Sequence, residues 1–133
     1  MRKDSKLKFK NNKALVRLTA QEEDVMLYIW KLGPCFIRDI LNEMPEPKPP
    51  YTSVASVVRN LEKKEYVTPK KFGPITLFSP RVKEAEYKRT FMSNVVQNYF
   101  TGSYKEMVSF FVRDHKLSKS DLQDLMDQIE KEE

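Results

Sequence analysis

The chain has 133 residues, of which 40% are hydrophobic and 32% charged, and its formal net charge is +5. This balance is typical of a globular protein and excludes a disordered one, and no apolar run approaches the roughly 20 residues that span a bilayer. With Cys35 as the only cysteine and His115 as the only histidine, the chain cannot form an internal disulfide or a Cys/His zinc site. We therefore expect a cytoplasmic protein without membrane insertion, catalytic residues, metal or cofactor.

The charge is unevenly distributed along the sequence. Residues 1–17 contain seven Lys and Arg residues against Asp4 alone, whereas acidic residues outnumber basic ones from Asp114 onward. A basic segment at one end is typical of a protein that binds a polyanion. Residues 1–17 also lack helix caps and a sustained apolar face, so they are predicted to be a flexible basic arm. The alternative is an arm that only aids solubility.

Two helices are predicted after this arm. Thr19-Ala-Gln-Glu22 is a capping box, in which Thr19 accepts from an early backbone N–H and Glu22 reaches back to the N-cap. Apolar residues follow at helical spacing until Gly33, which ends the first helix. The second, shorter helix closes at Pro45, because proline is rejected from a helix interior. A proline-rich connector then runs to residue 50.

Residues 51–65 predict a helix with two different faces. An apolar stripe at i, i+3, i+4 and i+7 is formed by Val54, Val57, Val58 and Leu61. The opposite face carries Thr52, Ser56, Arg59 and Lys63. Short hydroxyls allow a helix to approach a surface closely and cations neutralise phosphate, so this face suits a DNA groove. The alternative is an ordinary amphipathic helix whose polar face is solvated.

The pattern changes to that of strands after this helix. Residues 66–72 and 75–79 flank Gly73-Pro74 and are predicted to form a hairpin, in which Pro69 requires an edge strand or a bulge. A two-stranded hairpin is not stable alone, so it must pack on the helices. Three helices followed by a hairpin make a winged helix-turn-helix domain, predicted for residues 18–81, with Lys70 and Lys71 near the wing tip.

Residues 82–133 are predicted to form three helices, so the fold class is mainly α with a small β-hairpin. Three short helices with so much apolar surface cannot easily bury it alone, and association with a second copy is the simplest remedy. We therefore expect a helical dimerisation domain. Its interface residues are predicted to be Phe91, Val95, Tyr99, Met107, Phe110, Phe111, Leu122, Leu125, Met126 and Ile129.

The order of these segments resembles the penicillinase and methicillin-resistance repressors (BlaI/MecI-like) over residues 18–131. The matching residues are Leu18–Trp30, Arg38–Ile40, Tyr51–Val54, Leu61–Lys64, Phe78–Pro80, Glu86–Tyr87, Phe100–Ser103 and Leu117–Ser118, with the acidic last helix. The resemblance implies a homodimeric repressor with an N-terminal winged helix and a C-terminal helical dimerisation domain. It also implies release from dyad-symmetric operator DNA by cleavage in the C-terminal domain, through a membrane sensor protease pathway.

Carried over by position, the recognition helix is residues 52–64. The expected DNA-binding residues are Thr52, Ser53, Ser56, Arg59, Asn60, Lys63, Lys70 and Lys71, and Ala55 is also placed on the reading face. The cleaved bond is expected near Phe110 and Phe111, although the family often has an asparagine where this chain has Phe110. The wing turn lacks the basic residue that often follows its glycine, and the C-terminal cysteine cluster of a copper-responsive branch is absent.

The predicted function is a dimeric transcriptional repressor that binds double-stranded operator DNA. One alternative is a winged helix that serves only as a protein-interaction module, without sequence-specific DNA binding. Another is a nuclease, which would need clustered carboxylates for a metal ion. The acidic residues lie instead at ordinary solvent-face spacing along the terminal helix, which disfavours the nuclease.

Overall fold

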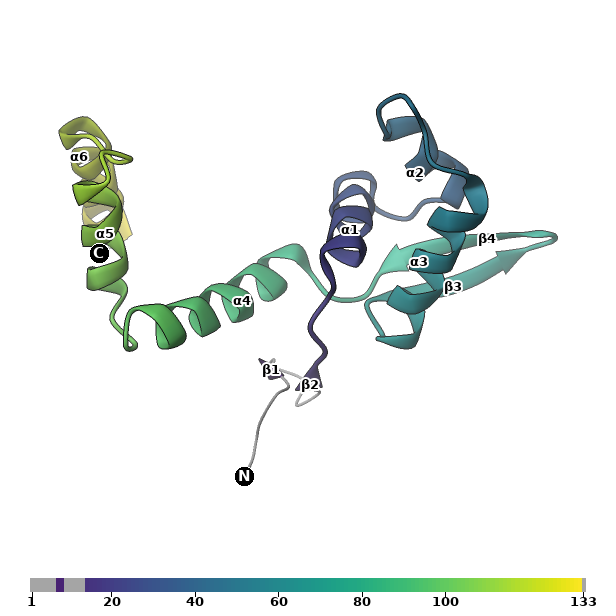
Figure 1. Ribbon diagram of the computed structural model, residues 1–133, viewed down its shortest axis with the longest axis horizontal. Helices are drawn as coiled ribbons and strands as arrows, with labels where there is room; N and C mark the ends of the chain where they lie inside the picture. Colours follow the sequence, from purple (N-terminus) through teal and green to yellow (C-terminus); the bar gives the residue numbers. More distant parts are fainter. Residues whose placement is uncertain (1–6, 9–13, 133) are drawn as a thin grey trace. The chain divides into compact units, whose positions relative to one another are not determined.

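The computed structural model describes residues 7–8 and 14–132, which form two compact units that divide between Thr90 and Phe91 (Figure 1). The first unit contains β1 (Leu7–Lys8), β2 (Ala14–Leu15), α1 (Ala20–Leu32), α2 (Ile37–Glu43), α3 (Tyr51–Lys63), β3 (Val67–Phe72), β4 (Ile75–Pro80) and the start of α4 (Glu84–Tyr99). The second contains the rest of α4, α5 (Tyr104–Arg113) and α6 (Lys119–Glu132). The predicted fold class, a winged helix followed by a helical domain, is confirmed. None of the helices described is long and apolar enough to cross a membrane.

Helix α1 begins at the predicted capping box. The Thr19 hydroxyl accepts from the Glu22 backbone N–H at 3.2 Å, and the Glu22 carboxylate accepts from the Thr19 N–H at 2.9 Å. The helix ends at Gly33, whose φ of +77° lies in the left-handed region where a side chain would be strained. Both predicted ends of this helix are therefore confirmed.

The core of the first unit lies between α1, α2 and α3. Met26, Ile29, Ile40, Val58 and Leu61 are completely buried there. Val58 and Leu61 belong to the apolar stripe predicted for residues 51–65, and the other three residues come from α1 and α2. The apolar face of α3 therefore holds it against the other two helices.

The hairpin is joined to the helices through β4. Backbone hydrogen bonds link Cys35 and Phe78 in both directions, at 2.9 and 2.8 Å, so the chain just before α2 pairs with the outer side of β4. The register runs without a bulge from Val67↔Pro80 to Phe72↔Ile75. In the part of the chain that the structure describes, β3 pairs only with β4 and is therefore an edge strand. At an edge, Pro69 loses no hydrogen bond to a third strand.

The predicted basic arm, residues 1–17, lies largely outside the described residues. In the described part, β1 pairs antiparallel with β2, Leu7 opposite Leu15. Leu15 is buried in the core, and the carbonyl of Val16 accepts a hydrogen bond from the Tyr66 hydroxyl. The packed domain therefore includes residues just before 18, where the sequence pattern placed its start.

The second unit buries little of its own apolar surface. Ser103 caps α5 by accepting from the Glu106 N–H at 3.1 Å, and Ser118 caps α6 by accepting from the Asp121 N–H at 3.0 Å. The rings of Phe100 and Phe110 meet edge to face at 5.8 Å. Even so, neither α5 nor α6 has a buried residue among those described.

Candidate nucleic-acid interface

Helix α3 separates its residues into a buried and an exposed face, as its sequence predicted. Its apolar stripe is buried in the core. The helix residues predicted to bind DNA are all exposed: Thr52, Ser53, Ser56, Arg59, Asn60 and Lys63. Short hydroxyls occupy the first half of this face and cations the second half. An exposed helix with this order of groups can approach base edges with its hydroxyls and phosphates with its cations.

One residue assigned to the reading face is not on it. Ala55 is only 4% exposed, so its prediction as part of the DNA-reading surface is wrong. The buried surface of α3 is wider than a single stripe, because α2 and the hairpin cover the helix in addition to α1. Ala55 faces that side and lines a cleft there.

This cleft, of about 770 Å³, lies between α2, α3 and the hairpin. Three cations line it from three different elements: Arg38 from α2, Arg59 from α3 and Lys71 from β3. The Arg38 guanidinium lies over the ring of Tyr51, 5.6 Å from its centroid, which is a cation–π contact. Within the described chain these three cations form no ion pair, so their charge is available to an external anion.

Two carboxylates also line the cleft, but one of them is already engaged. Asp39 accepts a hydrogen bond from the Phe36 backbone N–H at 2.8 Å and so caps the start of α2. The other is Glu62, an exposed residue of α3. The cations therefore outnumber the acids in the cleft, and a phosphate-bearing ligand suits it better than a cation.

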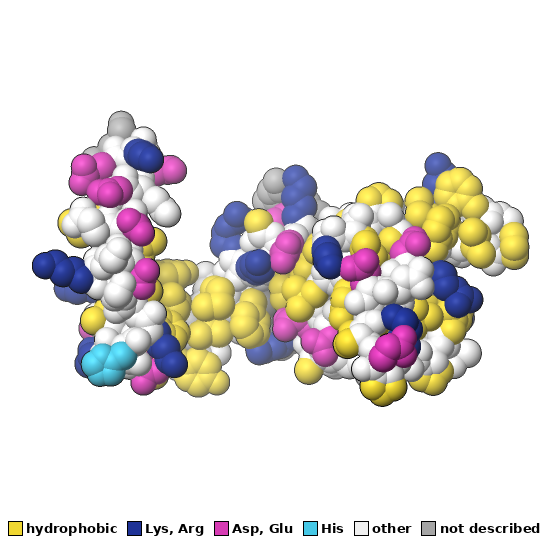
Figure 2. All heavy atoms as spheres, turned by 90° about the horizontal axis from the view of Figure 1, so that it is seen from above, with side chains coloured by type: hydrophobic (Ala, Val, Ile, Leu, Met, Phe, Trp, Pro, Cys, Tyr) yellow, Lys and Arg dark blue, Asp and Glu magenta, His cyan; other side chains and the backbone are white. Residues whose placement is uncertain are grey.

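The two wing lysines lie on different faces of the hairpin. Lys71 lines the cleft, whereas the Lys70 ammonium lies 5.5 Å from the ring centroid of Phe72. This difference follows from the alternation of side chains along a strand. Figure 2 shows hydrophobic side chains gathered at the end of the hairpin, with a basic side chain at their edge. Phe72 and Ile75, which flank the turn of the hairpin, are both exposed.

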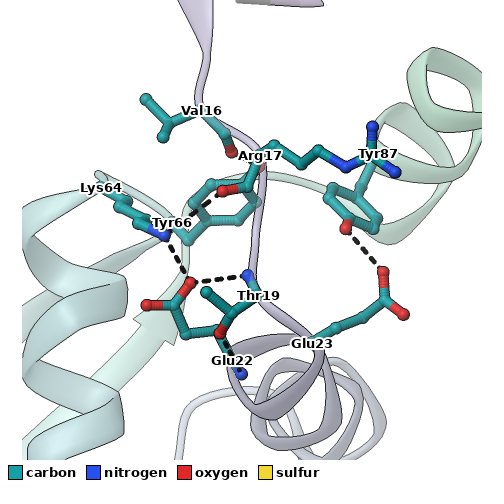
Figure 3. Close-up of polar contacts among 8 residues, drawn as sticks. All are labelled: Val16, Arg17, Thr19, Glu22, Glu23, Lys64, Tyr66 and Tyr87. Carbon is teal, nitrogen blue, oxygen red and sulfur yellow. Dashed lines mark hydrogen bonds and ion pairs between the residues drawn. The ribbon is translucent and has the colours of Figure 1, made fainter. Parts of the chain in front are cut away.

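A polar network fixes the C-terminal end of α3 against the start of α1 (Figure 3). The Lys64 ammonium, at the end of α3, contacts the Glu22 carboxylate at 2.5 Å and the Arg17 carbonyl at 3.3 Å. Burial is the largest influence on Glu22 and opposes its ionisation. The hydrogen bond and positive charge of Lys64, together with the hydrogen bonds from Thr19, outweigh burial, so the pKa of Glu22 is lowered. Lys64 is thus an internal partner of α1, in contrast to its exposed neighbour Lys63.

The same region ties α4 to the winged helix. The Tyr87 hydroxyl donates to the Glu23 carboxylate at 2.6 Å, and its ring contacts the rings of Trp30 at 5.4 Å and Tyr66 at 5.9 Å. The Trp30 indole N–H donates to the Val82 carbonyl at 2.8 Å. The first turns of α4 are therefore part of the unit that presents α3.

Arg38 lines the cleft but was not among the residues predicted to bind DNA, whereas Ala55 was wrongly placed on the reading face. Arg38 belongs to the Arg38–Ile40 segment on which the family resemblance rests, but its place in the same cleft as Lys71 depends on how α2 packs beside the hairpin. The structure brings Arg59 and Lys71 together at this cleft and places Lys70 on the other face. Among the described residues, no group of three His, Cys, Asp or Glu side chains is placed to hold a metal ion.

A family model described as penicillinase repressor matches residues 18–131. The match runs from the residue before the α1 capping box almost to the end of α6 and so includes both units. A search of curated proteins found no match.

Proposed function

Since this chain belongs to the penicillinase repressor family, we propose that it is a dimeric transcriptional repressor that occupies DNA operators of dyad symmetry. The observation that carries the proposal is the exposed face of α3, which combines short hydroxyls with Arg59 and Lys63 on a helix held firmly by its buried side. A helix of this kind is suited to the major groove, which admits an α-helix. Occupation of a promoter by the protein would block transcription.

The proposed contacts fall into two classes. Thr52, Ser53, Ser56 and Asn60 contact base edges or phosphates in the major groove. Arg59, Lys63, Lys70 and Lys71 neutralise phosphates, together with the basic N-terminal arm. Among the described residues the cations of the cleft form no ion pair, and this supports the second class, because an ion pair within the protein would have to be broken before a phosphate could bind.

The second unit, with the rest of residues 82–133, is proposed to be the dimerisation domain. Large apolar side chains of α5 and α6 are exposed to solvent in the single chain, among them Phe110, Met126 and Ile129, at 47%, 54% and 61%. Apolar side chains exposed in such number on two short helices suit a protein–protein interface. In a symmetric dimer, two copies of α3 enter successive major grooves about 34 Å apart.

Relief of repression is proposed to occur by proteolysis near Phe110 and Phe111. Both residues lie in the interior of α5, and both are more than a third exposed in the single chain. The chain around a peptide bond inside a helix must become extended before a protease can bind and cleave it. Cleavage therefore requires local unfolding of α5. Cleavage there would detach the end of α5 and all of α6, and with them apolar surface that the dimer needs. The two DNA-binding domains would then no longer be held together on the operator.

A gel-shift titration across salt concentrations tests DNA binding by the full chain. Binding through several phosphates per subunit releases counterions, so affinity for duplexes selected from random-sequence DNA should fall steeply as salt rises. Absence of binding, or binding that does not change with salt, would contradict the proposal. A protein that forms dimers but has no affinity for any duplex would instead be the protein-interaction module.

A further inference from the structure

The tip of the hairpin is apolar, although its stem is basic. Phe72 and Ile75 form its last cross-strand pair and are 47% and 51% exposed. Between them, Gly73 and the exposed Pro74 make a two-residue turn, and the φ of Gly73 is +60°. Residues 67–80 contain two lysines and no acidic residue. An exposed apolar cluster next to two cations suits a partner in which anionic groups flank a less polar surface.

The tip is continuous with the proposed DNA surface. Pro74 and Ile75 line the same cleft as Arg59 and Lys71. The cations of this cleft therefore lie between the exposed face of α3 on one side and the apolar tip of the hairpin on the other. In DNA, the major groove is followed by a sugar–phosphate strand and then by the minor groove. The order of groups on the protein matches this order: hydroxyls for the major groove, cations for the phosphates, and apolar side chains beyond them.

We propose that the apolar tip, Phe72–Ile75, enters the minor groove beside the half-site read by α3 and favours A·T pairs there. This inference rests on the proposed function, because it requires the protein to bind duplex DNA. Apolar side chains such as Phe, Ile and Pro are used as wedges in the minor groove, whose walls are formed by deoxyribose. Lys70 and Lys71 lie behind the tip, where the phosphates border the groove.

The preference for A·T pairs follows from the 2-amino group of guanine. Acceptor atoms line the floor of the minor groove in every base pair, and the G·C pair alone adds this hydrogen-bond donor. The side chains of Phe72, Pro74 and Ile75 contain no acceptor, so the tip would bury the amino group without a partner. An unsatisfied buried donor destabilises a complex. The tip thus selects against G·C pairs without making a hydrogen bond of its own.

The test uses the full chain and fluorescent duplexes built on a sequence selected from random DNA. The base pairs beside each half-site are made A·T, G·C or inosine·cytosine, since inosine lacks the 2-amino group but keeps the major-groove face of guanine. Fluorescence anisotropy should show similar binding to the A·T and inosine·cytosine duplexes. Binding to the G·C duplex should be about fivefold weaker or more, which is the effect expected of an unfavourable base pair.

A matched pair of variants distinguishes the contribution of the tip to DNA binding from the general effect of a more polar surface. Ile75→Ser should weaken binding to the A·T duplex about fivefold and abolish the difference between G·C and inosine·cytosine. Leu27→Ser replaces a side chain of similar exposure, 45%, on α1 and should change neither quantity. Hydroxyl-radical footprinting of the wild type should show protected minor-groove sugars beside each half-site. This protection should be lost in Ile75→Ser.

The outcomes distinguish this inference from the proposed function. If the wild type binds its selected duplex but has equal affinity for G·C and inosine·cytosine flanks, the tip does not read the minor groove, while the repressor function stands. The same conclusion follows if Ile75→Ser behaves as Leu27→Ser. A change in self-association with unchanged DNA affinity would identify the tip as a protein contact and overturn the inference. Failure to bind any duplex would overturn both proposals.

Discussion

Two adjacent lysines at the end of α3 have different roles. Lys63 is exposed, whereas the Lys64 side chain is three-quarters buried and contacts Glu22. The two residues cannot be distinguished by type or by helical propensity. Their difference arises because successive residues of a helix point about 100° apart, so only one of them faces α1. Only Lys63 is therefore free to contact DNA.

Arg59 is an exposed cation of α3 that also lines the cleft. Replacing it with alanine should weaken DNA binding by roughly 1–3 kcal/mol if its guanidinium reads a base. Anisotropy titrations against the selected duplex and against single-base variants of it measure this change. A base contact should also relax specificity at one position, whereas a phosphate contact should weaken binding to all duplexes and lower the salt dependence.

Arg89→Ala is a suitable control, because it removes the same charge from the exposed surface of α4. It should cause only the small loss expected from a lower net charge. If Arg59→Ala binds DNA no more weakly than Arg89→Ala, then Arg59 lies outside the interface.

At the scale of elements, the ion pair between Glu22 and Lys64 holds the recognition helix against α1. The Glu22 side chain is 7% exposed, and its carboxylate also closes the capping box with Thr19. Three elements, the segment before α1, α1 itself and α3, therefore meet at one carboxylate. The contact fixes the C-terminal end of α3.

Replacing Glu22 with glutamine should lower the free energy of unfolding by about 2 kcal/mol at neutral pH, because it leaves Lys64 without its charged partner. The amide oxygen can still accept from Thr19, so the cap is preserved. The pKa of Glu22 is lowered by folding from its ordinary value of 4.5, so its charge stabilises the folded chain above that pH. The contribution is lost as the pH falls through the folded pKa. Urea unfolding at several pH values measures the difference between variant and wild type.

The control for this prediction is Lys64→Met, alone and combined with Glu22→Gln. The single change leaves the buried Glu22 carboxylate without a cationic partner, so the stability of this variant relative to the wild type should recover as Glu22 is protonated in acid. The double variant should be less destabilised than the sum of the two single ones. Additive effects, or an effect of Glu22→Gln that is the same at every pH, would show that the ion pair does not stabilise the fold.

At the scale of the whole molecule, the two units differ in how completely they are packed. The first has a core of fully buried side chains, whereas α5 and α6 expose apolar surface along their lengths. Ile129 is the most exposed large aliphatic residue of α6, at 61%. In a protein that binds a dyad-symmetric site, such a surface can serve for dimerisation, which places two copies of α3 on one operator.

Ile129→Asp should therefore shift the chain from dimer to monomer at micromolar concentration, since it places a charge in an apolar interface. Sedimentation velocity measures the mass, and anisotropy should show weaker binding to a two-half-site duplex. Leu27→Asp makes the same substitution on the exposed surface of α1 and should remain dimeric. A dimer that survives Ile129→Asp would remove this residue from the predicted interface.

Much of the fold could be predicted because its signals are local. The capping box at Thr19 and Glu22, the end of α1 at Gly33 and the turn at Gly73 each depend on residues within a few positions of one another. The two faces of α3 likewise follow from helical period alone. The same period predicted the chemistry of the candidate site on this helix, namely hydroxyls and cations on its exposed face.

The sequence by itself determined the order of the helices, the hairpin, and the exposed face of α3, because spacing and capping act along the chain. Only the tertiary structure decided that Ala55 is buried, that Arg38 shares a cleft with Lys71, and that Lys64 binds Glu22. These facts depend on which surfaces α2 and the hairpin cover, and packing joins residues that are far apart in the sequence. The local pattern specifies a recognition helix, and the packing around it selects which of its side chains are free to bind.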